Sequence, residues 1–168
     1  MFNLKAEFYL KIIFLFSFIA LISAFFIEYA LGHQPCNLCL IERIPYGLSI
    51  LIIMLIFLIK KNQKFFVLLL ILTFTFSFAI SFYHFGIEQG FFQESSVCGV
   101  KSLTESITKE DLLKQLSEKA ISCRDVTFRI FGLSLTSINI VISLLFIITL
   151  LKIFKKYEKN KQKSSGIY

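Results

Sequence analysis

The sequence predicts an all-α membrane protein: a four-helix transmembrane bundle with a short amphipathic helix in its second outer loop. Composition is the first observation behind this prediction, because 56% of the 168 residues are hydrophobic and the mean hydropathy is +0.74. A soluble domain of this length has too little interior to bury so many apolar side chains. The second observation is four long apolar runs, each able to cross about 30 Å of hydrocarbon as a helix.

The chain is expected to form a single membrane domain over residues 1–168, with polar segments between the apolar runs. The four spans are expected at 8–31, 42–59, 65–83 and 130–153. The remaining segments are the outer loops 32–41 and 84–129, the cytoplasmic loop 60–64 and the basic tail 154–168. The alternating residues of a membrane β-barrel are absent from these runs.

Lysine placement orients the predicted bundle. Segments 1–11, 60–64 and 152–168 carry eleven lysines and two glutamates, whereas the rest of the chain carries seven cations and nine acids. Positive charge favours the cytoplasmic side, so both termini are expected in the cytoplasm and all four cysteines outside it. The basic tail is expected to contact anionic lipid and no nucleic acid, because no folded basic surface accompanies its lysines.

A cleaved signal peptide is the alternative for the first apolar run. Its start is basic, and Ala30-x-Gly32 resembles a cleavage site. However, the apolar core is longer than usual for a signal peptide, and Glu28 is an unusual neighbour for cleavage. We therefore expect a retained first helix, and cleavage would leave the cysteines on the same side.

Pro45 complicates the second span. If Pro45 is the first helical residue, the run to Ile59 covers only about 22 Å at 1.5 Å per residue. Part of 36–44 must then also lie at membrane depth, either as a helix kinked at Pro45 or as a turn buried against protein. In the helical case, Cys36, Cys39 and Arg43 fall on one face.

The four cysteines form two pairs. Cys36 and Cys39 form a Cys-x-x-Cys motif at the mouth of the second span, and Cys98 and Cys123 lie in the long outer loop. Such a motif is typical of redox or metal chemistry, and disulfides persist in oxidising compartments. Two dithiols facing one compartment, one of them at the lipid boundary, suggest that electrons pass from protein thiols into the membrane.

Arg43 follows this motif closely. A guanidinium and a helix N-terminus both favour a thiolate, and both would stabilise a reduced, anionic oxygen on an acceptor bound beside them. The alternative is that Arg43 extends to the lipid headgroups with Glu42 as its partner. Its position next to Cys-x-x-Cys favours the role at the redox site.

The outer loop between Cys98 and Cys123 has a helical pattern of its own. Thr108 to Asp111 resemble a capping box, and the leucines that follow recur at helical spacing. This predicts a short amphipathic helix on the membrane surface or over the bundle. A disulfide across the loop would be worth roughly 3 kcal/mol as a structural staple. A mobile, exposed disulfide would instead be labile, and the loop alone leaves both possibilities open.

Five sequence features together resemble the DsbB family of disulfide-bond formation proteins. They are Pro-Cys-x-x-Cys-x-x-Glu-Arg at 35–43, Tyr-His-Phe-Gly-Ile-Glu at 83–88, Cys98, Cys123, and Phe-Gly-Leu-Ser at 131–134. The resemblance covers nearly the whole chain. It implies a bacterial inner-membrane protein with four transmembrane helices, both termini in the cytoplasm and periplasmic cysteines. It also implies a soluble partner, a DsbA-like periplasmic thiol oxidase whose reduced Cys-x-x-Cys must be reoxidised.

The resemblance also implies a role for each site residue. Cys98 would be attacked by the partner, and Cys123 would pass electrons on by engaging Cys36. Cys39 would face and reduce a quinone, ubiquinone or menaquinone, from the membrane pool, with Arg43 beside it. His84 stands at the family's position at the outer end of the third span. A quinone contact, a proton-handling role and an interfacial hydrogen bond are all open for it, and Glu88 is expected to pair with a nearby Lys or Arg.

Three other functions fit parts of the pattern. Four cysteines could bind zinc tetrahedrally, although only one pair has Cys-x-x-Cys spacing and the compartment is oxidising, so no metal is expected. The chain could be a disulfide-stapled, non-catalytic subunit of a membrane complex. Quinone-coupled enzymes of the vitamin K epoxide reductase type are similar in logic, but their Cys-x-x-Cys follows the other cysteine pair along the chain. The order here argues against that class.

Overall fold

Four long helices make up most of the described protein in this computed structural model, which describes residues 4–59, 62–93, 98, 123, 129–130 and 133–165. The elements are α1 (Leu4–Tyr29), α2 (Asn37–Leu58), α3 (Gln63–Glu88), β1 (Arg129–Ile130), β2 (Leu133–Ser134) and α5 (Leu135–Ser165). All four helices are long and apolar enough to span a membrane, which confirms the predicted all-α membrane bundle. The amphipathic helix predicted for the outer loop lies outside the described residues.

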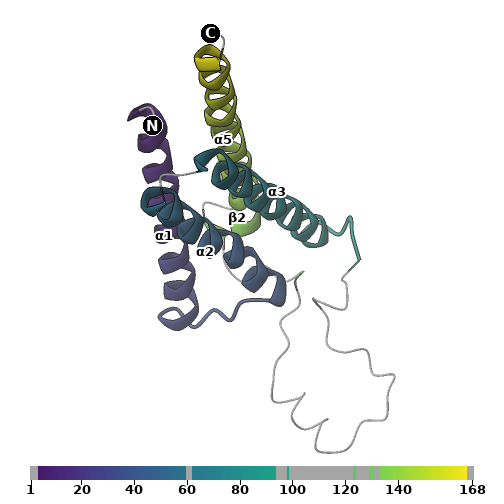
Figure 1. Cartoon of the computed structure of the whole chain (residues 1–168). Coiled ribbons are helices and arrows are strands. Elements are labelled where there is room, and N and C mark those ends of the chain that lie inside the picture. The colour runs from purple at the N-terminus through teal and green to yellow at the C-terminus, as the bar shows by residue number, and fades with distance from the viewer. Residues whose placement is uncertain are drawn as a thin grey trace, which may run out of the picture.

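The helices pack in a simple order, α1 against α2, α2 against α3, and α3 against α5, while α1 and α5 touch only briefly. Figure 1 shows both termini at the same end of the bundle. Apolar side chains such as Leu10, Ile53, Phe74 and Leu150 are fully buried where the helices meet. Many other large apolar side chains point outward. Such a surface is expected for helices surrounded by lipid and is unfavourable in water.

The second span begins earlier than predicted. Helix α2 starts at Asn37, immediately after Cys36, and continues through Pro45 to Leu58. Of the two forms considered for residues 36–44, the helix is therefore the one observed. Its 22 residues cover about 33 Å, so α2 crosses the hydrocarbon even though Pro45 cannot donate a backbone hydrogen bond inside it.

The third and fourth spans also differ at their outer ends. Helix α3 continues to Glu88, so His84 lies in its last turns and not at the start of a loop. Helix α5 starts at Leu135, five residues later than predicted, because Arg129–Ile130 and Leu133–Ser134 pair as a short antiparallel ladder. The longer α3 faces the first turn of α5, and this contact positions the polar groups of the site.

Polar side chains link the helices inside the bundle. Ser49 on α2 donates to Ser17 on α1 (3.0 Å), and Ser143 on α5 donates to Ser77 on α3 (3.1 Å). Asn139 on α5 donates to Ser81 on α3 (2.7 Å). Hydroxyl and amide groups in a membrane interior need such partners, because no water is present to satisfy them. These bonds fix the rotation of each helix about its axis and therefore determine which groups reach the site.

Gly86 makes room for the chain that leaves α3. Its carbonyl accepts from the backbone N–H groups of Phe91 (2.8 Å) and Phe92 (3.1 Å), and a Cβ at this position would overlap the Phe92 ring. The Phe92 ring in turn stacks on Tyr83, with 5.7 Å between the ring centroids. The glycine of the 83–88 motif thus has a packing role: it lets the chain after α3 fold back against the end of the helix.

Replacing Gly86 by alanine is expected to destabilise the protein. Overpacking costs about 1–3 kcal/mol, which exceeds the gain of about 1 kcal/mol from placing alanine in a helix. Gly47→Ala is the matched control, since a Cβ there meets nothing within 4 Å. Thermal unfolding in detergent should show a lower midpoint for Gly86→Ala and an equal or higher midpoint for Gly47→Ala. Equal shifts in the two variants would contradict the packing role.

Candidate active site

Cys36 caps the N-terminus of α2. Its sulfur accepts a hydrogen bond from the backbone N–H of Cys39 (3.3 Å), one of the donors that a helix start leaves without an intrahelical partner. The pKa of the Cys36 thiol falls from 9.0 to about 4, chiefly because the Cys39 side chain hydrogen-bonds to the sulfur. Contacts with His84 add to this lowering, and burial opposes it. Cys36 is therefore a thiolate at neutral pH whenever the Cys36–Cys39 pair is reduced.

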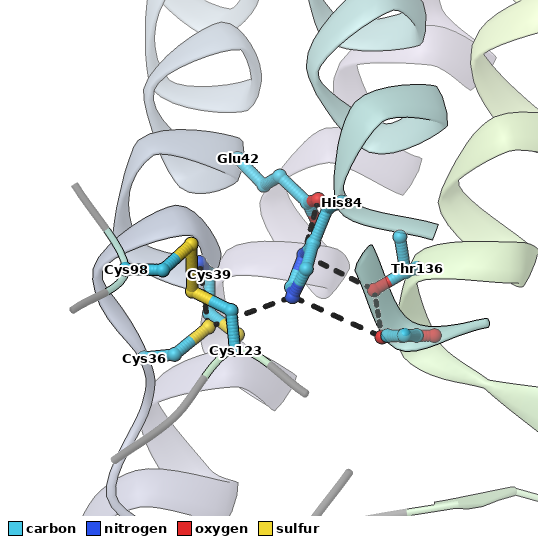
Figure 2. Close-up of a disulfide and its surroundings, with 8 residues drawn as sticks. Cys36, Cys39, Glu42, His84, Cys98, Cys123 and Thr136 are labelled. Atoms are coloured by element: carbon cyan, nitrogen blue, oxygen red, sulfur yellow. Dashed lines mark hydrogen bonds and ion pairs between the residues drawn. A yellow bond between two sulfur atoms is a disulfide. The ribbon is translucent and has the colours of Figure 1, made fainter. Parts of the chain in front are cut away.

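The second cysteine pair packs directly on the first. Cys98 and Cys123 form a disulfide with 5.5 Å between their Cα atoms, while Cys36 and Cys39 are not bonded to each other. Cys36, Cys98 and Cys123 are all buried in one cluster, and Cys39 packs against it. Figure 2 shows the Cys98–Cys123 disulfide beside Cys36 and Cys39. The fold thus brings together the four cysteines that the sequence singled out.

His84 connects this sulfur cluster to the interior of the bundle. Its Nε2 lies 3.6 Å from the sulfur of Cys36, and its Nδ1 lies 2.9 Å from Oε1 of Glu42. A carboxylate can only accept, so the Glu42 contact places a hydrogen on Nδ1 and leaves Nε2 available to take a proton from sulfur. A thiol beside a base that is itself oriented by a carboxylate is the usual arrangement of an activated nucleophile.

Glu42 is held in place from a third helix. Asn139 on α5 donates to its second oxygen (3.3 Å), and Tyr46 donates to the amide oxygen of Asn139. The side chain of Glu42 is only 11% exposed. Because both of its oxygens have partners, Glu42 fixes the orientation of the imidazole relative to Cys36.

Glu88 has different neighbours from those expected. It was predicted to pair with a lysine or arginine, but its Oε1 accepts a hydrogen bond from Thr136 (2.7 Å) and lies 3.9 Å from Nε2 of His84. Figure 2 shows Cys36 and Thr136 on opposite sides of His84. The helical extension of α3 explains the difference, because His84 and Glu88 then lie one turn apart on the face that meets α5.

Arg43 also has a different partner from the one considered for it. In the alternative considered for Arg43, Glu42 was its partner at the headgroups, but Arg43 forms an ion pair with Glu28 of α1. Its guanidinium also lies over the ring of Phe25, 5.3 Å from the ring centroid. The side chain is only 16% exposed. Arg43 is therefore held inside the bundle between α1 and α2, where buried charges are costly and usually functional.

A cavity of about 360 Å³ opens beside these groups. Its polar end includes Cys39, Arg43, His84 and Glu88. Apolar side chains of α1 and α5 form much of the rest, among them Phe16, Ile19, Ala20, Ile27, Ile138 and Ile142. This volume and lining suit a largely apolar ligand with polar atoms at one end, which would lie next to Cys39 and Arg43.

Sequence reasoning missed three groups of this site. Glu28 was considered only as a neighbour of the possible cleavage site, Thr136 was not considered, and Glu42 was given no role beyond a partner for Arg43 and a position in the 35–43 motif. Glu28 carries a recognisable signal, since an acid inside an apolar run is costly and marks a functional position. Thr136 carries no such signal, because its role depends only on how α5 packs against α3.

The fold and the site define a multi-pass membrane protein with a thiol redox centre near one end of its helices. The chain matches the family described as "Disulfide bond formation protein DsbB" over residues 6–153. It is also 31% identical over 147 residues to the uncharacterized protein RP370 of Rickettsia prowazekii (strain Madrid E), and the match covers 86% of each chain. The protein belongs to the DsbB family, and is therefore a membrane thiol oxidoreductase of disulfide-bond formation.

Proposed function

We propose that this protein reoxidises a DsbA-like thiol oxidase in the bacterial periplasm and passes the electrons to a membrane quinone. The observation that supports this most directly is the convergence of both cysteine pairs on one buried cluster, with Cys39 lining the adjacent cavity. Thiols that exchange electrons must approach within bonding distance, and the terminal acceptor must reach the last sulfur.

The proposed transfer begins at the loop pair. A partner thiolate attacks Cys98, the Cys98–Cys123 bond breaks, and Cys123 leaves as a thiolate. Cys123 then attacks Cys36 of the oxidised Cys36–Cys39 pair, and Cys39 leaves as a thiolate. The second partner thiol releases Cys98, which re-forms its bond to Cys123 and frees Cys36. Two electrons have then moved from the partner dithiol to Cys36 and Cys39.

The environment of Cys36 favours this direction of transfer. A thiolate is a better leaving group when its pKa is low, and stabilising the thiolate makes the Cys36–Cys39 disulfide a stronger oxidant. The electrons therefore move from the loop pair toward the pair beside the cavity.

A bound quinone would supply the two-electron, two-proton acceptor that thiols alone cannot provide. The chain contributes the binding groups and the charges around them. Arg43, held by Glu28, places a fixed positive charge at the polar end of the cavity, where electron transfer creates negative charge. Apolar side chains of α1 and α5 exclude water from the same space.

The proposed location is the bacterial inner membrane, with both termini in the cytoplasm and the cysteines in the periplasm. Eleven lysines lie in segments 1–11, 60–64 and 152–168. Figure 1 shows both termini at the same end of the bundle. Only this orientation allows a periplasmic partner to reach Cys98. Labelling of Cys98 from the cytoplasmic face of sealed vesicles would contradict it.

Replacing Cys98 by serine is expected to stop partner oxidation completely. Purified protein is mixed with a reduced DsbA-like partner and a soluble quinone, and quinone absorbance and the partner's thiols are followed together. The wild type should turn over many times, whereas Cys98→Ser should oxidise no partner and keep its Cys36–Cys39 bond. Partner oxidation by Cys98→Ser at the wild-type rate would overturn the proposed order of transfer.

The same assay decides between the enzyme and a disulfide-stapled structural subunit. A staple predicts that neither partner oxidation nor quinone reduction occurs with the wild type, although the Cys98–Cys123 bond is present. A relay predicts equal amounts of quinone reduced and partner oxidised. The zinc alternative predicts stoichiometric metal in the purified protein, and it needs Cys98 and Cys123 as separate thiolates, whereas here they are bonded to each other.

A further inference from the structure

One buried carboxylate oxygen has no role in the proposed transfer of electrons. Among the residues that the structure describes, Oε2 of Glu88 is the buried side-chain oxygen for which no hydrogen-bond partner is present. The Glu88 side chain is only 5% exposed. Leaving such an atom buried without a partner costs free energy, so its persistence calls for a function.

The groups around Glu88 form a short path for a proton. Nε2 of His84 lies 3.6 Å from the sulfur of Cys36 and 3.9 Å from Oε1 of Glu88. Thr136 donates to that same oxygen and lies 3.3 Å from Nδ1 of His84. A proton on the imidazole thus has the thiol on one side and a carboxylate on the other, and Glu88 also lines the cavity.

We propose that Glu88 stores the proton of the redox reaction: it binds a proton when Cys36 becomes a thiolate and releases it toward the cavity when the Cys36–Cys39 disulfide re-forms. This inference rests on the proposed function for the identity of the final acceptor. In the storage step, the proton leaves the Cys36 sulfur for Nε2 of His84, and His84 passes it to the Glu88 carboxylate. The step moves one proton and no electrons, and the charge of the cluster is unchanged.

Electrostatics explains why Glu88 would take up a proton on reduction. A new negative charge on sulfur disfavours a second negative charge on a nearby carboxylate. The ionisable groups of α2 and its cap that face this cluster are Cys36, Cys39, Glu42, Arg43 and Tyr46, and α3 contributes His84. Glu28 of α1 is paired with Arg43, while α5 contributes the neutral Thr136 and Asn139. Glu42 already has partners for both oxygens, so Glu88 is the carboxylate able to change its proton content.

Infrared difference spectroscopy tests the storage step without partner or quinone. The Cys36–Cys39 pair is reduced in full-length protein that also carries Cys98→Ser and Cys123→Ser, so that no other disulfide responds. Reduction should produce a carboxylic acid C=O band that shifts in D₂O. The band should be lost in Glu88→Gln, and in Glu88→Asp it should return at a shifted frequency. Glu158→Gln, a glutamate exposed at the other end of the bundle, should keep it.

Two results would overturn the proposal: a band that survives unchanged in Glu88→Gln, or a band that is lost only in Glu42→Gln. Because this experiment needs no quinone, it remains informative if the proposed acceptor is wrong.

In otherwise unmodified protein, Glu88→Gln should also slow quinone reduction about 100-fold, as expected for loss of a proton-transferring group. Unchanged quinone reduction by folded Glu88→Gln would count equally against the storage role.

Discussion

Replacing Cys39 by serine should convert the enzyme into a protein that oxidises its partner once and then stops. The Cys98–Cys123 disulfide is intact in this variant, so one partner dithiol can be oxidised by each molecule. Cys36 then has no neighbouring sulfur with which to form a disulfide, and electrons cannot reach the acceptor. Quinone reduction should fall to the rate of the uncatalysed reaction with free thiols.

The measurement combines rapid mixing with chemical quenching. The amount of partner oxidised should equal the amount of Cys39→Ser protein, with no change in quinone absorbance. Cys98→Ser is the matched control, because it makes the same chemical change at the other pair and should give no first turnover. Continued turnover by Cys39→Ser would show that the acceptor takes electrons from another sulfur.

The difference between these two serine variants follows from where each sulfur lies. Cys98 and Cys123 are buried in the cluster but do not share a helix, whereas Cys36 and Cys39 occupy the first turn of α2. Cys39 lines the cavity with Arg43 only four residues further along that helix. The position of Cys39 on a rigid helix at the membrane boundary is what makes it the expected exit for electrons.

The membrane bundle could be predicted because lipid imposes a simple requirement on sequence. An apolar run of about 20 residues in a membrane must form a helix, and lysines outside the runs indicate its direction. The ends of the helices could not be predicted in the same way. Helix α2 begins at Asn37 because the sulfur of its cap, Cys36, accepts from a backbone N–H, and cysteine is not among the residues that usually cap helices.

For the site as well, some features could be predicted from the sequence and others could not. The spacing and order of the four cysteines pointed to a redox relay, and the structure gathers all four in one place. The partners of the charged residues were predicted less well, because sequence neighbours are poor guides to contacts between helices. Arg43 pairs with Glu28 across α1 and α2, and Glu42 turns instead to His84 on α3. Only the packing of the bundle determines these pairs.

His84 is the residue whose replacement should change the thiol chemistry most while leaving the cysteines in place. In the wild type, a Cys36 pKa of about 4 means that the reduced sulfur is fully ionised at pH 6 and above. Without the imidazole, the pKa of Cys36 should rise toward its ordinary value of 9.0, because the contacts of His84 with the sulfur, which lower this pKa, are lost. The hydrogen bond from Cys39 remains, so the new value should stay below 9.0.

The rate of Cys36 alkylation against pH measures this change directly, since the thiolate is the reactive form. Reduced wild-type protein should react at a nearly constant rate above pH 6 and slow only in acid. Reduced His84→Gln should react more slowly at pH 6, and the two proteins should converge once the pH exceeds the new pKa. A higher pKa lowers the thiolate fraction of Cys36 only at pH values below the new pKa. The alkylation rate of His84→Gln should therefore fall below that of the wild type only in this pH range.

Two controls separate this effect from a change in structure. Thr75→Val alters another residue of α3, whose hydroxyl donates only to its own helix, and it should leave the alkylation midpoint unchanged. Glutathione in the same buffers gives the profile of a thiol without a protein environment. If His84→Gln kept the wild-type midpoint, the low pKa would come from Cys39 and the helix start alone. His84 would then have no part in activating Cys36, and the route by which we propose that its proton reaches Glu88 would be lost.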